Sequence, residues 1–209
     1  YDIFDLPQSE IQERMKQDSE KIKEGINRIA NIVESMREMS QSSKEIKEET
    51  NIYATLITSL TMAYNRSRQV SKIYLNGKLF DMDSIDKNEY IYLCKVQKQR
   101  MEQVWIIVIN NALDELIKID NYEDRILNIN IFEDNNEIII KFKDTAGGIN
   151  KEIISDIFEP FISSKLHSGM GVGLNIAKKI VDEQDGKIRA YNEDSGAVFE
   201  IRLQKCEEE

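Results

Sequence analysis

Three glycines at every second position, Gly169, Gly171 and Gly173, directly precede a predicted helix. Glycines at a helix start leave the first backbone N–H groups open, and together with the helix dipole these groups favour an anion such as a phosphate. The spacing is not the G-x-G-x-x-G of dinucleotide-binding folds, and the chain has no G-x-x-x-x-G-K-[ST] phosphate loop. Its only histidine, His167, lies in the same stretch. By itself, the triplet predicts only that phosphates can approach this helix.

Three further segments carry residues suited to binding a ligand. "NNALDE", at 110–115, puts two carboxamides inside an otherwise apolar predicted helix, where they need partners. "KDTAGGI", at 143–149, sets a carboxylate before small residues that let backbone or a flat ligand come close. "IFEPFISSK", at 157–165, places two phenylalanines around a proline and ends in a lysine. Taken singly, these segments can also be surface asparagines, an ordinary turn and a loop held by aromatic residues.

Alternating predicted helices and strands position these segments. A helix with a broad apolar face is predicted from about 97 to 119, and a second one at 172–184. Strands at 127–131 and 138–142 alternate apolar and polar residues around a predicted hairpin turn, "EDNNE". Two final strands are predicted at 186–192 and 197–203.

A similar pattern precedes them. Thr50 is predicted to cap a helix, and a strand with a turn at Asn76–Gly77 and an apolar, β-rich run at 89–96 follow it. The residues expected to share the apolar face of that helix are Ile52, Leu56, Leu60 and Ala63. From Thr50 onward, this order of elements predicts an α+β fold: a two-layer α/β sandwich, in which helices cover one face of a mixed sheet.

A long N-terminal helix is predicted from about 9 to 40, with Ser9 as its cap. Its apolar residues alternate steps of four and three, which is a heptad seam. A helix with one apolar stripe is not stable alone, so we expect it to pair in a helical hairpin or a dimer. Packing against its own domain is the alternative. The seam consists of Ile22, Ile26, Ile29, Val33 and Met36.

The composition limits the function classes. A net charge of -10 argues against binding to nucleic acid, whose phosphates would repel the chain. Cys94 and Cys206 match no metal or redox spacing and are interpreted as reduced thiols of a cytoplasmic protein. No apolar run is long enough to span a membrane, and a start at Tyr1 suggests a piece of a longer protein. We therefore expect membrane attachment only if upstream segments provide it.

Together and in this order, the four segments resemble the ATP-binding domain of sensor histidine kinases, in the superfamily shared with gyrase and mismatch-repair ATPases. "QVWIIVINNALDEL" resembles the N box, "DTAGGI" the first glycine box, "IFEPFISSK" the phenylalanine box and "GMGVGL" the second glycine box. The resemblance covers roughly 50–204 and implies a Bergerat-type ATP-binding fold. The long helix before it resembles the second helix of the family's dimerisation and histidine-phosphotransfer hairpin.

The resemblance implies roles for individual residues. Asn111 corresponds to the asparagine that holds Mg²⁺, for which an amide oxygen is a suitable hard ligand. Asp144 corresponds to the aspartate that accepts a hydrogen bond from the adenine amino group, and Gly147 and Gly148 leave room for the base. The remaining nucleotide-binding residues implied by the lid and the second glycine box are Ser164, Lys165, Gly169, Gly171, Gly173 and Leu174.

The chain also departs from the family pattern. Ile107 stands where the N box has a polar residue, which puts in doubt a general-base or water-positioning role there. Ala146 replaces the first glycine of its box, and Asp114 and Glu115 stand where related kinases often carry a lysine or arginine. No histidine precedes His167, whereas the phosphoacceptor of the family lies on the first hairpin helix. We therefore expect that first helix to be absent and this fragment to be unable to phosphorylate itself.

We interpret residues 1–48 as a partial dimerisation and phosphotransfer region, and 49–209 as the ATP-binding catalytic domain. The predicted function is that of a two-component sensor histidine kinase: it binds Mg-ATP and passes the γ-phosphoryl group to a histidine and then to a response-regulator aspartate. The expected partners are a second copy, through the hairpin, and a receiver domain. Two alternatives are a gyrase-like conformational ATPase and a degenerate module that binds nucleotide without transfer.

Overall fold

The computed structural model describes residues 11–19, 22, 25–26, 46–162 and 171–206. The chain divides into two units, Tyr1–Ser42 and Ser43–Glu209, which are described separately.

In the first unit, the described residues are helical at 11–19, 22 and 25–26, as predicted. Ile22 and Ile26 of the heptad seam have exposed side chains, at 63% and 60%. An apolar seam open to solvent needs a covering partner, so the pairing of this helix stays a prediction. The other seam residues, Ile29, Val33 and Met36, lie outside the described residues.

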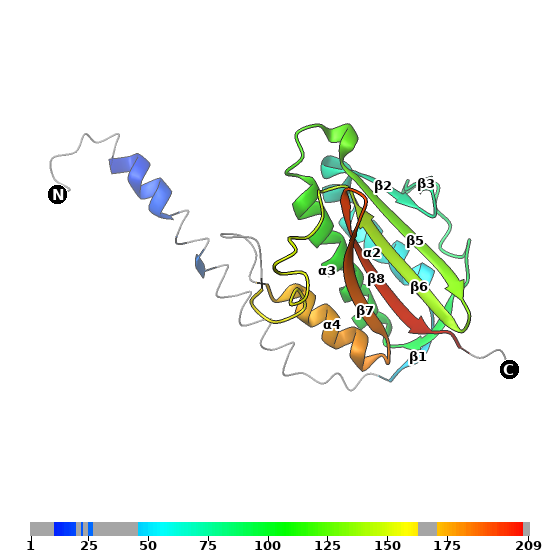
Figure 1. The fold of residues 1–209 in the computed structure, drawn as a ribbon. Helices are drawn as coiled ribbons and strands as arrows, with labels where there is room; N and C mark the ends of the chain where they lie inside the picture. The colour runs from blue at the N-terminus through cyan, green and yellow to red at the C-terminus, as the bar shows by residue number, and fades with distance from the viewer. Residues whose placement is uncertain (1–10, 20–21, 23–24, 27–45, 163–170, 207–209) are drawn as a thin grey trace. The chain divides into compact units, whose positions relative to one another are not determined.

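The second unit is built on a six-stranded mixed sheet with the strand order β3-β2-β5-β6-β8-β7 (Figure 1). Strand β2 runs parallel to β5, and the other neighbouring pairs are antiparallel. The strands are β2 (Lys72–Leu75), β3 (Lys78–Leu79), β5 (Ile126–Asp134), β6 (Glu137–Asp144), β7 (Lys187–Glu193) and β8 (Gly196–Gln204).

Three helices cover one face of this sheet: α2 (Ile52–Val70), α3 (Lys98–Leu116) and α4 (Gly173–Glu183) (Figure 1). Fully buried side chains of the sheet, such as Phe142 and Phe199, lie opposite one another in adjacent strands and form the core with the helices. Trp105 of α3 stacks on Phe142 with ring centroids 5.9 Å apart, and its indole N–H donates to Thr55 of α2 at 2.9 Å. The predicted two-layer α/β sandwich is therefore confirmed.

Both predicted hairpin turns are present. Asn76 and Gly77 connect β2 to β3 with φ of 48° and 79°, the left-handed conformation of a two-residue hairpin turn. Asn135, with φ of 56°, begins the turn between β5 and β6.

The prediction that Thr50 caps α2 is wrong. The cap is Asn51, whose side-chain oxygen accepts the N–H of Tyr53 at 3.2 Å. Thr50 lies in a short strand, β1 (Glu48–Asn51), which pairs with β4 (Leu93–Val96). The strand that pairs with it, β4, lies about 40 residues further along the chain, so the polar sequence around Thr50 did not reveal β1.

The cysteines are both free, and the sheet edge brings them near each other: Cys94 is buried, and the backbone N–H of Cys206 donates to Leu93 at 2.8 Å. Burial raises the pKa of Cys94 to about 12, and the thiol of Cys206 adds to this shift. Such a thiol is a poor nucleophile. Across the described part of the chain, we find no helix whose length and hydropathy would let it cross a membrane.

The face of the sheet away from the helices carries a charged cluster around Glu200, whose side chain is fully buried. Arg202 and Arg189 donate to its carboxylate at 2.7 and 2.9 Å, Lys141 lies 3.4 Å from it, and the hydroxyl of Tyr191 donates at 3.3 Å. Burial opposes ionisation of Glu200, but the bonds and charges of the two arginines outweigh it and lower the pKa to about 2.

Candidate nucleotide-binding site

One face of α3 lines the candidate site. Ile107, Asn111 and Glu115 follow each other at one-turn intervals, so they share this face. Cγ2 of Ile107 lies 3.4 Å from the position that a Cβ atom would take on Gly173, which begins α4. At the other end, the charge of Glu115 contributes to raising the pKa of Asp144 at the end of β6. Asn111 therefore lies between the start of α4 and the end of β6.

The carboxamide of Asn111 is half-buried, and within the described ranges it has no hydrogen-bond partner. A half-buried amide that makes no internal bond keeps its oxygen available for a ligand or a cation. Its neighbour Asn110 differs, because its amide oxygen accepts a hydrogen bond from Arg66 of α2, which also pairs with Asp114. The two asparagines are thus divided: Asn110 joins α2 to α3, and Asn111 faces the site.

Asp144 is the last residue of β6, and its carboxylate is bonded to the backbone through one of its two oxygens. Its Oδ1 accepts the N–H of Ala146 at 2.9 Å and the N–H of Ala197 at 3.1 Å. Burial raises the pKa of the carboxyl above its ordinary value, the two N–H bonds oppose this shift, and the charge of Glu115 adds to it. In the described part of the chain both bonds end on Oδ1, so Oδ2 remains an acceptor for a ligand.

The loop after Asp144 depends on its glycines. Gly147 and Gly148 both have φ of 84°, a conformation that other residues rarely adopt. The space beside Gly147 is open, with no atom within 4 Å of a built Cβ, and its N–H donates to the carbonyl of Ser195 at 2.8 Å. On the other side of the loop, the hydroxyl of Thr145 donates to the carbonyl of Asp124 at 2.6 Å. These bonds fix a small, open surface next to the carboxylate.

The start of α4 closes the site on the remaining side. The N–H of Phe161 donates to the carbonyl of Gly171 at 3.0 Å, and the side chain of Asn175 donates to the carbonyl of Phe158 at 2.9 Å. Gly171 has φ of 65°, and a Cβ there would lie 2.3 Å from the carbonyl oxygen of Ile162. The structure therefore places the described part of the phenylalanine-box segment next to Gly171 of the second glycine box.

The first turn of α4 has no acidic residue and no side-chain cap. Within the described ranges, its first N–H groups have no side-chain partner, which is compatible with the anion site predicted from the glycine triplet; that site stays a prediction. Gly173 is exposed at the first position of the helix, and Leu174 is half-buried beside it. The other predicted lid residues, Ser164, Lys165, His167 and Gly169, lie outside the described residues.

Three residues that hold the loop from the β7–β8 turn were not predicted from the sequence: Asn192, Ser195 and Gly196. A Cβ on Gly196 would lie 1.7 Å from the carbonyl oxygen of Asp144, so only glycine fits there. The segment has the sequence of an ordinary polar hairpin turn, and its partners lie about 50 residues away in the chain. The only local sign of its role was therefore Gly196 itself.

Comparison with known proteins identifies the domain. Residues 97–207 match the model of a family described as histidine kinase-, DNA gyrase B-, and HSP90-like ATPase. The chain belongs to this family. The matched range contains the α3 face, Asp144, the glycine loop and α4, so the elements that line the candidate site all lie in the part shared with this family.

The curated relatives of this ATPase domain are sensor kinases. The chain is 34% identical over 107 residues to the C4-dicarboxylate transport sensor protein DctB of Rhizobium meliloti, a match that covers 51% of this chain and 17% of the relative. It is 29% identical over 141 residues to the sensor protein KdpD of Clostridium acetobutylicum, covering 65% and 15%. The chain thus spans less than a fifth of either relative's length, and the part that it shares is the histidine kinase ATP-binding catalytic domain.

A solved structure shares the fold. The histidine kinase ThkA in complex with the response regulator protein TrrA matches with a TM-score of 0.67 and 21% identity, covering 97% of this chain and 53% of that chain. At this identity, the likeness concerns the fold.

Proposed function

We propose that this ATPase-family domain binds Mg-ATP between α3, the loop after β6 and the start of α4, and serves as the catalytic part of a two-component sensor histidine kinase. The observation that supports this most is that two acceptors lining the candidate site have no hydrogen-bond partner among the residues that the structure describes. They are Oδ2 of the buried Asp144 and the carboxamide of the half-buried Asn111.

Asp144 would select the base. Oδ2 accepts a hydrogen bond from the exocyclic amino group of adenine, whereas guanine presents an oxo group that a carboxylate repels. The open surface beside Gly147 leaves room for the flat ring, and Gly148 keeps the loop in its left-handed conformation. Because Oδ1 is already bonded twice, the carboxylate is fixed before the nucleotide arrives.

Asn111 would hold Mg²⁺ through its amide oxygen. The described residues contain no group of three or more His, Cys, Asp or Glu side chains that could hold a metal ion by themselves. Magnesium would therefore depend on Asn111 together with phosphate oxygens and water, which is the usual way in which proteins bind the magnesium of a nucleotide. When bound, the ion neutralises phosphate charge.

The rest of the phosphate site would come from α4 and the lid. The uncapped N–H groups at the start of α4, near Gly171, Gly173 and Leu174, face the phosphates. Ser164, Lys165 and Gly169 would add contacts from the lid, Lys165 by its charge. Phosphoryl transfer needs positioning and charge stabilisation more than covalent help, so a chain with Ile107 in place of a polar residue can still carry it out.

We further propose the assembly expected of such kinases. The exposed seam residues Ile22 and Ile26 fit a homodimer through a helical hairpin, and the ThkA structure contains a response regulator, which is the class of partner proposed for this chain. The γ-phosphoryl group would pass to a histidine on the hairpin and then to a receiver-domain aspartate. The chain would work in the cytoplasm.

The test uses the full-length product of the gene that encodes this chain, incubated with radiolabelled ATP and Mg²⁺. We expect a phosphoprotein whose phosphate is labile in acid and stable in base, as phosphohistidine is, and we expect Asp144→Asn to reduce its rate of formation. Steady ATP hydrolysis without a phosphoprotein would instead support a gyrase-like ATPase. A protein that binds nucleotide but does neither would be a degenerate module.

A further inference from the structure

The side chain of Asn192, at the end of β7, pairs with the backbone of the glycine loop. Its Oδ1 accepts the N–H of Ile149 at 2.7 Å, and its Nδ2 donates to the carbonyl of Ile149 at 2.8 Å. A carboxamide thus takes the place that a neighbouring strand would have, using one donor and one acceptor. No other side chain of this length offers both, since aspartate lacks the donor and serine is too short to reach both groups.

The same carboxamide packs against Gly148. A Cβ atom on Gly148 would lie 2.8 Å from Oδ1 and 2.9 Å from Cγ of Asn192, closer than real Cβ contacts. Asn192 therefore fills the space beside Gly148 and fixes the loop on the side away from the open surface at Gly147.

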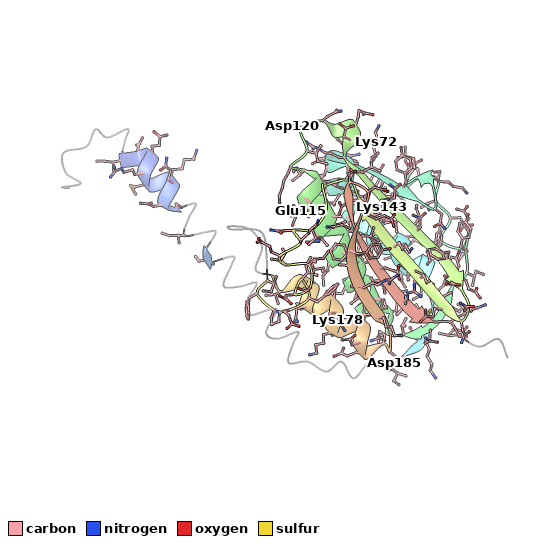
Figure 2. All side chains as sticks on the ribbon, in the orientation of Figure 1. Lys72, Glu115, Asp120, Lys143, Lys178 and Asp185 are labelled. Atoms are coloured by element: carbon pink, nitrogen blue, oxygen red, sulfur yellow. The ribbon has the colours of Figure 1, made fainter. Side chains whose placement is uncertain are left out.

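The turn that follows Asn192 holds the rest of the loop. The carbonyl of Ser195 accepts the N–H of Gly147, and the N–H of Ala197 donates to Oδ1 of Asp144. Next to Asp144, Lys143 donates to Glu193 at 2.7 Å and also pairs with Asp194. Every residue named from the turn contacts the segment between Lys143 (labelled in Figure 2) and Ile149, so these bonds tie the β7–β8 turn to the glycine loop.

We infer that Asn192 is a positioning residue of the nucleotide site: it holds the glycine loop at the distance from Asp144 that the adenine ring requires. The inference rests on the proposed function, because a loop without a ligand needs no such position. Asn192 is exposed, and within the described ranges its side chain bonds only the backbone of Ile149, so it acts through the loop and not by direct contact with the nucleotide.

The test compares dissociation constants of a non-hydrolysable ATP analogue, in Mg²⁺, for the 209-residue chain and its variants. Asn192→Ala removes both bonds, and we expect about tenfold weaker binding. Asn130→Ala is the matched control, because Asn130 is also an exposed asparagine in a strand but has no bond to the loop. It should bind as the unchanged chain does. Thermal unfolding of each variant separates weaker binding from loss of folded protein.

A double-mutant cycle gives a readout that general destabilisation does not move. Gly148→Ala should weaken binding strongly in the unchanged chain, where the new Cβ meets Asn192 and the backbone is strained at a φ of 84°. In the Asn192→Ala background only the backbone strain remains, so the loss should be clearly smaller. Equal losses in both backgrounds, or unchanged affinity in Asn192→Ala, would overturn the inference while the proposed function stands. If the unchanged chain does not bind the analogue at all, the proposed function fails first. If Gly148→Ala does not fold, amide exchange of Ile149 decides instead: it should be faster in Asn192→Ala and unchanged in Asn130→Ala.

Discussion

The backbone N–H of Ala197 donates a 3.1 Å hydrogen bond to Oδ1 of Asp144, across 53 residues of sequence. The start of β8 thereby fixes the carboxylate at the end of β6, and Ala146 bonds the same oxygen. Among the described residues, the second oxygen, Oδ2, has no hydrogen-bond partner, and the proposed function assigns it to the ligand. Because the two carboxylate oxygens have different roles, a substitution of Asp144 can keep the bonds to the backbone and still change the contact with a ligand.

Asp144→Asn should weaken binding of ATP about tenfold to a hundredfold while the protein stays folded. The amide oxygen of asparagine can still accept from Ala146 and Ala197, but its NH₂ group then replaces Oδ2 and faces the adenine amino group, donor against donor. Calorimetric titration measures the affinity. Asp83→Asn, in an exposed loop, is the matched control and should bind normally. Undiminished affinity of Asp144→Asn would rule out base recognition by this carboxylate.

Asn111→Ala should remove the dependence of nucleotide affinity on magnesium. In the unchanged chain, we expect ATP to bind more tightly with Mg²⁺ than with a chelator, because Asn111 supplies a ligand to the ion. The variant should show similar affinities in both conditions. Asn110→Ala is the control, since Asn110 is bonded to Arg66 and not to the site, and it should keep the magnesium effect. A full magnesium effect in Asn111→Ala would place the ion elsewhere.

Trp105→Phe should destabilise the second unit without altering the ligand contacts. The substitution removes the hydrogen bond from the indole to Thr55 and part of the stacking on Phe142, and it leaves a cavity at a fully buried position. We expect a loss of about 2 kcal/mol in the free energy of unfolding, measured by urea denaturation. A change below a few tenths of a kcal/mol would show that α2 and α3 are not held by this contact.

Glu200 should make the stability of the protein depend on pH in the acid range. Its folded pKa, about 2, lies below the ordinary value of 4.5, so its ionised form stabilises the fold. That contribution is complete above about pH 4.5 and is lost as the pH falls toward 2. Compared with the unchanged chain, Glu200→Gln should have a lower melting temperature at pH 7, and its melting temperature should fall less between about pH 5 and pH 2. Parallel curves for the two proteins would contradict this role of Glu200.

Much of the architecture could be predicted from the sequence. Alternation in β5 and β6, the Asn76–Gly77 turn and the apolar faces of α2 and α3 are local patterns whose period depends on the element alone. The order of four short segments also indicated the ATP-binding family. Asn111 and Asp144 lie inside such local motifs, so the resemblance proposes a role for each of them without any knowledge of the fold.

The contacts between distant segments could not be predicted in this way. Asn192 pairs with Ile149 and Gly196 packs on Asp144 because β7 and β8 lie beside β6 in the sheet, and sheet order is not a local property of sequence. Thr50 illustrates the same limit: a helix-capping residue by type is part of β1, because β4 offers it a partner. The sequence likewise could not tell which of Asn110 and Asn111 is bonded within the fold, because this depends on the position of Arg66 in α2.

The most direct test of the account is a crystal structure of this chain with a non-hydrolysable ATP analogue and Mg²⁺. We predict the adenine amino group within hydrogen-bond distance of Oδ2 of Asp144, the base beside Gly147, and the ion bound by the amide oxygen of Asn111. An analogue bound elsewhere, or a base that does not contact Asp144 at saturating concentration, would contradict the account.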